Sequence, residues 1–227
     1  MSAPVLELAG VTKNYGALRP LRLAEFVLAQ GEHVAMLGLD QPAAEVLINL
    51  VTGATLPDTG IVRVFGRTTS DITETDDWLT VLDRCGIVSD RSALIEPMTV
   101  LQNLAIPFSL ELDPPPAEIA LQATALAREA GLGEPALEQR VGDLDAASRL
   151  RVRLGRALAM NPALLLLEHP SATLARTDVI RFACDVRDLA ERRGIPTLTI
   201  TADPEFAGAV STLAVVLEPA TGRLRKP

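Results

Sequence analysis

The chain has 227 residues, of which 48% are hydrophobic and 22% are charged, so it can bury a sizeable core within one large domain. Its formal net charge of −8 argues against a nucleic-acid-binding protein, which normally presents a basic face. The sequence begins without a signal-peptide pattern, and no apolar run approaches the ~20 residues that span a bilayer. Because Cys85 and Cys184 lack a metal-ligand spacing, we expect free thiols in a cytoplasmic protein.

The first third of the chain is predicted to be rich in strands. Alternating or short apolar runs bounded by turns predict strands within residues 5–15, 26–39 and 57–67. Residues 43–53, with the sequence AAEVLINLVTG, predict a short helix that ends near Gly53.

From about residue 78 to residue 133 the pattern becomes mainly helical. A short strand is predicted at 86–90, and helices are predicted within 98–108 and 113–133. The second of these helices opens after three prolines and closes at Gly131. One face of it carries a set of apolar residues, namely Ile119, Ala123, Leu126, Ala127 and Ala130.

The last third alternates helices and strands. An arginine-rich helix is predicted at 148–160 and an amphipathic helix at 177–194. Residues 163–170, ALLLLEHP, are so apolar that we expect a strand buried on both faces of a parallel sheet. Two further strands are predicted at 196–203 and 212–219. This alternation predicts an α/β fold built on a parallel sheet.

Six segments occur in an order and spacing that resembles the nucleotide-binding domain of ABC transporters. They are LAGVTKNYGALRPL (8–21), QGEHVAMLG (30–38), LPDTGIVRVFGR (56–67), ALIEPMTVLQNL (93–104), RVRLGRALAMNPALLLLEHPSATL (151–174) and IPTLTITADPEFA (195–207). The resemblance implies a single domain over residues 1–227 with a P-loop NTPase-like α/β fold, an antiparallel β subdomain and a helical subdomain at about 90–160. Residues 98–108 are also similar to subfamilies that serve lipid-type and MCE-associated permeases.

The phosphate loop of that family has the pattern G-x-x-x-x-G-K-[ST], in which backbone amides and the lysine hold phosphate and the hydroxyl holds Mg²⁺. The corresponding residues are Gly38, Leu39, Asp40, Gln41, Pro42, Ala43, Ala44, Glu45 and Val46. Ala43 stands at the second glycine, Ala44 at the lysine and Glu45 at the hydroxyl. Losing the lysine removes a charge-assisted contact with phosphate that contributes roughly 1.5–3 kcal/mol to binding. A carboxylate ~4 Å from a phosphate adds roughly 4 kcal/mol of repulsion, so tight ATP binding is not expected.

The family's second strand motif supplies an aspartate for Mg²⁺ and a glutamate as general base. Glu168 and His169 stand at these positions. His169 could accept a proton only with a nucleotide and a water beside it, and the alternative is a solvent-side histidine at a strand end. Tyr15 stands where the family stacks an aromatic ring on adenine, and its alternative role is packing.

The family's signature motif binds the γ-phosphate held by the opposite subunit. Here Asp145 replaces its serine, and Ala146 and Ala147 replace its glycines. Three further positions have lost the family's functional group, namely Asp90 at the glutamine, Ala175 in the D-loop and Ala202 at the switch histidine.

Acidic residues lie at both helix starts that should meet phosphate. We hypothesise that the carboxylates of Asp40, Glu45 and Asp145 occupy these anion sites from within, because helix N-termini carry unpaired N–H groups and partial positive charge. The alternative is that these residues have drifted to solvated acids without a role.

The resemblance therefore implies a subunit that docks on a membrane permease through residues 92–103, at the inner face of the membrane. We expect a non-hydrolysing pseudo-ATPase without catalytic or metal-ligating residues and without a cofactor, ATP and Mg²⁺ being bound residually if at all. Its partners would be the permease and a dimer partner, either a second copy or an intact ATPase subunit. Two alternatives are an active ABC ATPase with unusual motifs and a regulatory or scaffold protein derived from the fold.

Overall fold

The structure is a computed structural model that describes residues 4–227, so the first three residues of the predicted domain and N-terminus lie outside the described part. The strands are β1 (Pro4–Lys13), β2 (Leu21–Ala29), β3 (His33–Leu37), β4 (Thr59–Val64), β5 (Arg67–Thr68), β6 (Cys85–Val88), β7 (Leu164–Glu168), β8 (Thr197–Ile200), β9 (Leu213–Glu218) and β10 (Arg223–Arg225). The helices are α1 (Gln41–Val51), α2 (Thr75–Asp83), α3 (Val100–Ala105), α4 (Ala117–Glu129), α5 (Ala146–Leu158), α6 (Arg176–Arg193) and α7 (Pro204–Val210). Short 3-10 helices occur at Thr69–Asp71, Glu134–Ala136 and Val141–Asp143.

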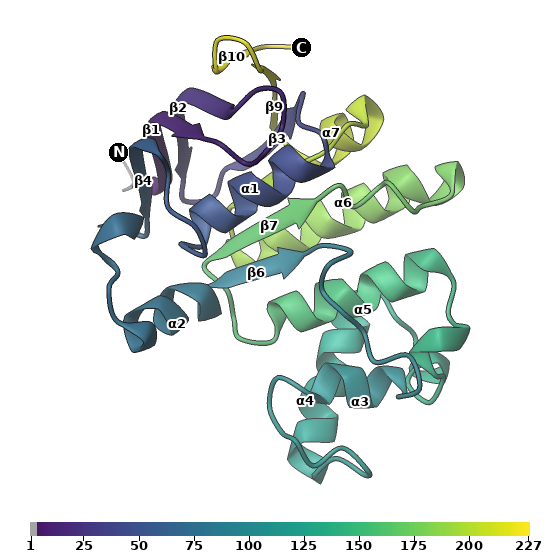
Figure 1. The fold of residues 1–227 in the computed structure, drawn as a ribbon. Coiled ribbons are helices and arrows are strands. Elements are labelled where there is room, and N and C mark those ends of the chain that lie inside the picture. The colour runs from purple at the N-terminus through teal and green to yellow at the C-terminus, as the bar shows by residue number, and fades with distance from the viewer. Residues whose placement is uncertain (1–3) are drawn as a thin grey trace.

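The strands form two sheets (Figure 1). The six-stranded sheet has the order β10-β9-β3-β8-β7-β6 and is parallel from β9 to β6, with β10 antiparallel at its edge. The four-stranded sheet is antiparallel and has the order β2-β1-β4-β5. Every residue of β3, β7 and β8 is buried, as expected for central parallel strands covered on both faces.

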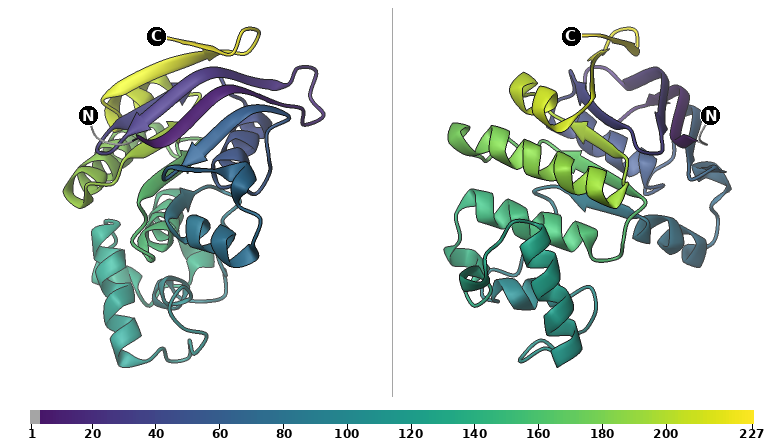
Figure 2. Two further views of the ribbon diagram at one scale, coloured as in Figure 1. Left: turned by 90° about the vertical axis from the view of Figure 1, so that its left-hand side faces the viewer. Right: turned by 180° about the vertical axis from the view of Figure 1, so that it is seen from behind.

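Helices cover both faces of the six-stranded sheet. Helix α1 lies between the two sheets, and its buried side chains share one hydrophobic core with strands of both (Figure 1). Helices α5, α6 and α7 cover the opposite face, which carries a second core (Figure 2). Helices α3 and α4 pack with α5 around a further core. Leu150, Leu154 and Leu158 of α5 belong to the core under the sheet, whereas Val152 belongs to the core with α3 and α4.

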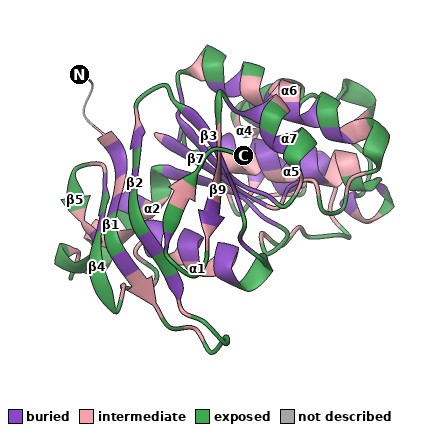
Figure 3. Cartoon of the chain, turned by 90° about the horizontal axis from the view of Figure 1, so that it is seen from above, coloured by how far each residue is buried: buried purple, intermediate pink, exposed green. Residues whose placement is uncertain are grey.

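Most predicted elements are present. The predicted inward faces of α5 and α6 are buried, and Figure 3 shows α6 and α7 with exposed residues on their outer sides. Helix α1 begins two residues before the predicted segment because Asp40 caps it and Pro42 is tolerated in a first turn. Gly53 follows the cap residue Thr52 with φ +73°. Helix α7 and strand β10 were not predicted, although Asp203 and Pro204 form a helix-start signal.

The free state of Cys85 and Cys184 is confirmed. Along residues 4–227 no helix combines the length and apolar character that crossing a membrane requires. The division into a single domain with a helical subdomain at about 90–160 stays a prediction.

Candidate nucleotide site

The predicted phosphate loop lies where β3 ends and α1 begins. Gly38 has φ +92°, a conformation that strains any L side chain, and a Cβ there would lie 2.5 Å from the carbonyl oxygen of Leu217. The fold itself therefore requires this glycine. The next residue, Leu39, is buried in the core, and Val46 on α1 packs partly buried against the same core.

Asp40 caps the N-terminus of α1. Its carboxylate accepts a hydrogen bond from the Ala43 N–H at 3.0 Å, while Pro42 has no N–H to offer. Ala43 and Ala44 are buried, so methyl groups stand where the family resemblance placed a glycine and a lysine. The hypothesis that the Asp40 carboxylate occupies this helix start is confirmed.

Glu168 ends β7, and its side chain has 0% exposure. One carboxylate oxygen, Oε1, accepts from the side-chain amide of Gln41 at 2.5 Å. The other, Oε2, accepts from Arg91 Nη2 at 2.7 Å and from Arg91 Nε at 3.2 Å. This buried carboxylate is thus held by one guanidinium and one amide, which is the pairing that a buried charge requires.

The hypothesis that Glu45 also occupies the anion site is wrong. Its carboxylate accepts from Arg91 Nη1 at 3.1 Å, and the helix-start N–H of Ala43 donates to Asp40 instead. The physical reason is that Arg91 supplies a full positive charge, whereas the helix start supplies a partial one that Asp40 already occupies. Arg91 therefore joins Glu45 to Glu168.

His169 follows Glu168 in a left-handed conformation, with φ +43°. Its backbone N–H donates to the Ile200 carbonyl oxygen at 2.8 Å, which ties it to the end of β8. The ring atom Nε2 is buried and has no hydrogen-bond partner among the described residues. The residue as a whole is half-buried, so the alternative of a solvent-side histidine does not hold for this ring atom.

Asp145 caps α5 as Asp40 caps α1. Its carboxylate accepts from the Ser148 N–H at 2.7 Å, and this backbone hydrogen bond lowers the pKa of Asp145. Ala146 is exposed and Ala147 is half-buried in the first turn of the helix. The hypothesis of internal occupation is confirmed at this helix start.

Asp90 lies in the loop after β6 and forms an ion pair with Arg153 of α5 at 3.0 Å. Asp90 and Ala146 both line a groove of about 490 Å³, so the structure brings these two predicted positions together. Ala175 is the N-cap residue of α6 without a side-chain cap, and Ala202 is exposed after β8. Neither alanine offers a polar side-chain atom.

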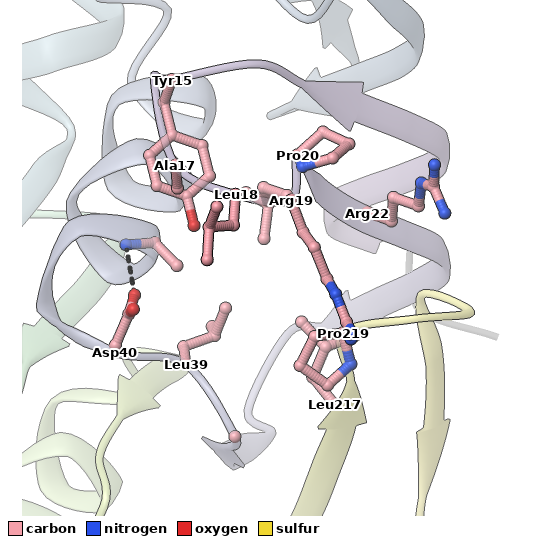
Figure 4. Close-up of a pocket in the computed structure, with 13 residues that line it drawn as sticks. Tyr15, Ala17, Leu18, Arg19, Pro20, Arg22, Leu39, Asp40, Leu217 and Pro219 are labelled. Atoms are coloured by element: carbon pink, nitrogen blue, oxygen red, sulfur yellow. Dashed lines mark hydrogen bonds between the residues drawn. The ribbon is translucent and has the colours of Figure 1, made fainter.

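Tyr15 lines a cavity of about 560 Å³ together with Gly38, Leu39, Asp40 and Ala43. Figure 4 shows the Tyr15 hydroxyl directed toward the side of the cavity that Asp40 forms. Partial burial, and secondarily the Asp40 charge, raise the pKa of Tyr15. The tyrosine therefore lies beside the loop that the resemblance assigns to phosphate, and it also packs against the core.

Sequence reasoning missed Arg91, which lies 77 positions from Glu168 in the chain. No local pattern marks it, since it is one arginine in a loop. A signal exists in the topology, because the parallel pairing of Val88 with Leu167 brings the residues after β6 and β7 to one edge of the sheet.

A strand that is followed by a glycine and a helix, in the same parallel sheet as a strand that ends in a buried carboxylate, is the arrangement of an α/β fold of the P-loop type. A family model described as ABC transporter matches residues 21–172, and the chain belongs to this family. The predicted family and fold class are confirmed. The nucleotide-binding role of the individual positions stays a prediction.

Several known proteins are similar to this chain. The methionine import ATP-binding protein MetN of Brucella abortus is 27% identical over 217 residues, covering 96% of this chain and 58% of that protein. The lipoprotein-releasing system ATP-binding protein LolD of Anaeromyxobacter dehalogenans is 30% identical over 211 residues, covering 91% of this chain and 88% of that protein. The dimeric post-hydrolysis structure of the ATP-binding cassette MJ0796 bound to ADP and Pi has a TM-score of 0.77 at 23% identity, covering 97% of this chain and 98% of that one.

Proposed function

We propose that this protein is an ABC-transporter subunit of the ATP-binding type that docks on a membrane permease and does not hydrolyse ATP. The observation that carries the proposal is the state of two helix starts, where Asp40 and Asp145 cap the amides that the resemblance assigns to phosphate. A phosphate would have to displace a carboxylate from each helix start and would then lie beside it. Both steps oppose binding, since like charges repel in a partly desolvated site.

The residues present do not fit Mg²⁺–ATP in the manner that the resemblance implies. Ala44 is uncharged and buried, and Glu45 adds a negative charge that Arg91 already neutralises. The buried Nε2 of His169 has no partner that would orient it as a base in the described part of the chain. This set supplies neither a charge for a γ-phosphate nor a positioned group that activates water.

Docking on a permease is supported by the region from the loop after β6 to α3. Arg153 Nε donates to the Ser92 carbonyl oxygen at 3.3 Å, and Arg156 Nη1 donates to the Ala93 carbonyl oxygen at 2.5 Å, so α5 fixes this loop. A groove of about 240 Å³ lies beside it, and Met160 at its rim is 52% exposed. The chain would thereby reside peripherally at the inner face of the membrane.

The proposal includes a dimer partner, either a second copy or an intact ATPase subunit. The similar MJ0796 cassette forms a dimer in its structure, which supports this arrangement by fold. Because the chain spans about 58% of the length of MetN, transport activity, substrate and partner identity are all part of the proposal.

Three measurements test the proposed function. Calorimetric titration of the purified chain with ATP in the presence of Mg²⁺ should show no saturation below millimolar concentration, and a phosphate-release assay should match the buffer blank. A micromolar dissociation constant would overturn the expectation of weak ATP binding, and turnover above the blank would overturn the non-hydrolysing assignment. Native purification of the tagged chain from membranes should recover a permease.

A second candidate is an active ABC ATPase with unusual motifs. It is favoured by relatives named as ATP-binding proteins and by the cavity beside Tyr15. The phosphate-release assay decides between the two. A regulatory or scaffold role predicts that no permease accompanies the chain, so the membrane purification decides that alternative.

A further inference from the structure

We propose that Arg91 is a built-in cation that holds the space between Glu45 and Glu168 and keeps divalent metal ions out of it. The inference deepens the proposed function, on which it rests, by naming the group that closes the metal side of the same site. It concerns the charges of Arg91, Glu45 and Glu168 in the wild-type protein and can be tested without any nucleotide.

The buried end of the arrangement is Glu168. An ionised carboxylate with 0% exposure is stable only when a cation and hydrogen-bond donors satisfy it. Among the described residues, Arg91 is the only cation that forms an ion pair with it, and Gln41 supplies the remaining donor. The charge of Glu168 is therefore matched within the protein.

The outer end is Glu45, which Arg91 reaches through its other terminal nitrogen at 3.1 Å. One planar guanidinium thus connects α1 to β7, a geometry that a lysine ammonium could not reproduce because it is a single point charge. The side chains of Arg91 and Glu45 are 38% and 44% exposed. Ions from solvent can therefore reach this end of the network.

The ligand chemistry explains what the guanidinium excludes. Without Arg91, the carboxylate oxygens of Glu45 and Glu168 that its guanidinium now holds would face a common space. Hard oxygen ligands of this kind suit Mg²⁺ and Mn²⁺, and Mg²⁺ typically uses one or two carboxylates with water completing its shell.

The test compares Mn²⁺ binding and thermal stability in four full-length chains: wild type, Arg91→Met, Arg91→Lys and the double variant Arg91→Met with Glu168→Gln. We expect the Arg91→Met substitution to lower Tm by roughly 6–20 °C, because it leaves a buried charge unpaired. Millimolar Mn²⁺ should recover part of that loss and should leave the wild-type Tm unchanged. The double variant, which has no buried charge to neutralise, should regain stability without metal and show no Mn²⁺ response.

Electron paramagnetic resonance of free Mn²⁺ gives the second readout. Arg91→Met should bind Mn²⁺ at least tenfold more tightly than wild type, and Arg91→Lys, which keeps a cation but not the bridge, should be intermediate. Equal Mn²⁺ binding by wild type and Arg91→Met would overturn the inference, as would a metal response retained in the double variant. If Arg91→Met does not fold, equal binding by wild type and Arg91→Lys overturns it. An ATP titration that contradicts the proposed function leaves these Mn²⁺ results unaffected, so the two failures are distinguishable.

Discussion

Replacing Asp145 by alanine removes the side-chain cap of α5. The Ser148 N–H, which donates to the Asp145 carboxylate at 2.7 Å, then loses its partner. Substitutions of this kind destabilise a helix or protein by about 1 kcal/mol. For a chain of this size, that loss corresponds to a fall in Tm of roughly 2–4 °C. Because Asp145 is exposed, the substitution does not create a cavity. The loss of stability therefore measures the contribution of the capping hydrogen bond.

The pH dependence of this effect has a defined sign. The hydrogen bond from Ser148 lowers the pKa of Asp145 in the folded state, so the carboxylate contributes stability above its unfolded pKa, about 3.9 for an aspartate. That contribution is lost as the pH falls through the folded value. The Tm difference between wild type and Asp145→Ala should therefore be full at pH 7 and should shrink below about pH 4.

Thermal unfolding of wild type, Asp145→Ala and Asp145→Asn at several pH values measures the prediction. Asparagine caps a helix about as well as aspartate but carries no charge, so Asp145→Asn is the matched control and should stay close to wild type at pH 7. An alanine variant as stable as wild type at pH 7 would refute the reasoning that this carboxylate occupies the helix start.

Three further predictions concern other parts of the molecule. Gly38→Ala should destabilise the chain by about 2 kcal/mol or more, measured by urea unfolding, since it combines a strained φ with a 2.5 Å approach to a neighbouring carbonyl oxygen. Burial raises the pKa of Cys85 to about 12, so a thiol reagent at pH 8 should leave Cys85 unmodified while half-buried Cys184 reacts, as peptide mass spectrometry would detect. Arg151→Met should lower the free energy of unfolding by roughly 1–3 kcal/mol in the same urea assay, because it breaks the pair with Asp185 and leaves a carbonyl oxygen unsatisfied.

Local patterns predicted the elements that bury a continuous face. The five buried residues of β7 and the six inward residues of α6 follow directly from a run of leucines and from helical periodicity. Helix α7 escaped prediction because it has only seven residues, and β10 because it has three and pairs only with β9 at the sheet edge. Such short elements form where tertiary contacts support them rather than where the sequence periodicity is strong.

The candidate site divides in the same way. The capping roles of Asp40 and Asp145 were predictable, because an N-cap hydrogen bond spans three residues of one chain segment. The partner of Glu45 was not predictable, because Arg91 comes from a loop 46 positions away. Nothing in the local sequence says which carboxylate that arginine will contact. The carboxylates that a long, flexible arginine side chain contacts depend on which strands the folded sheet brings together.

Helix α5 has a consequence for how the molecule opens. Its leucines support the sheet while Val152 faces α3 and α4, so the two cores meet along one helix. Moving α5 away from the sheet, or away from α3 and α4, exposes apolar surface in either case, so we expect α5 to open only when the sheet opens. Amide hydrogen exchange in the middle of α5 should then follow the same global opening as β7, while the ends of α3 and α4 exchange through smaller, local openings.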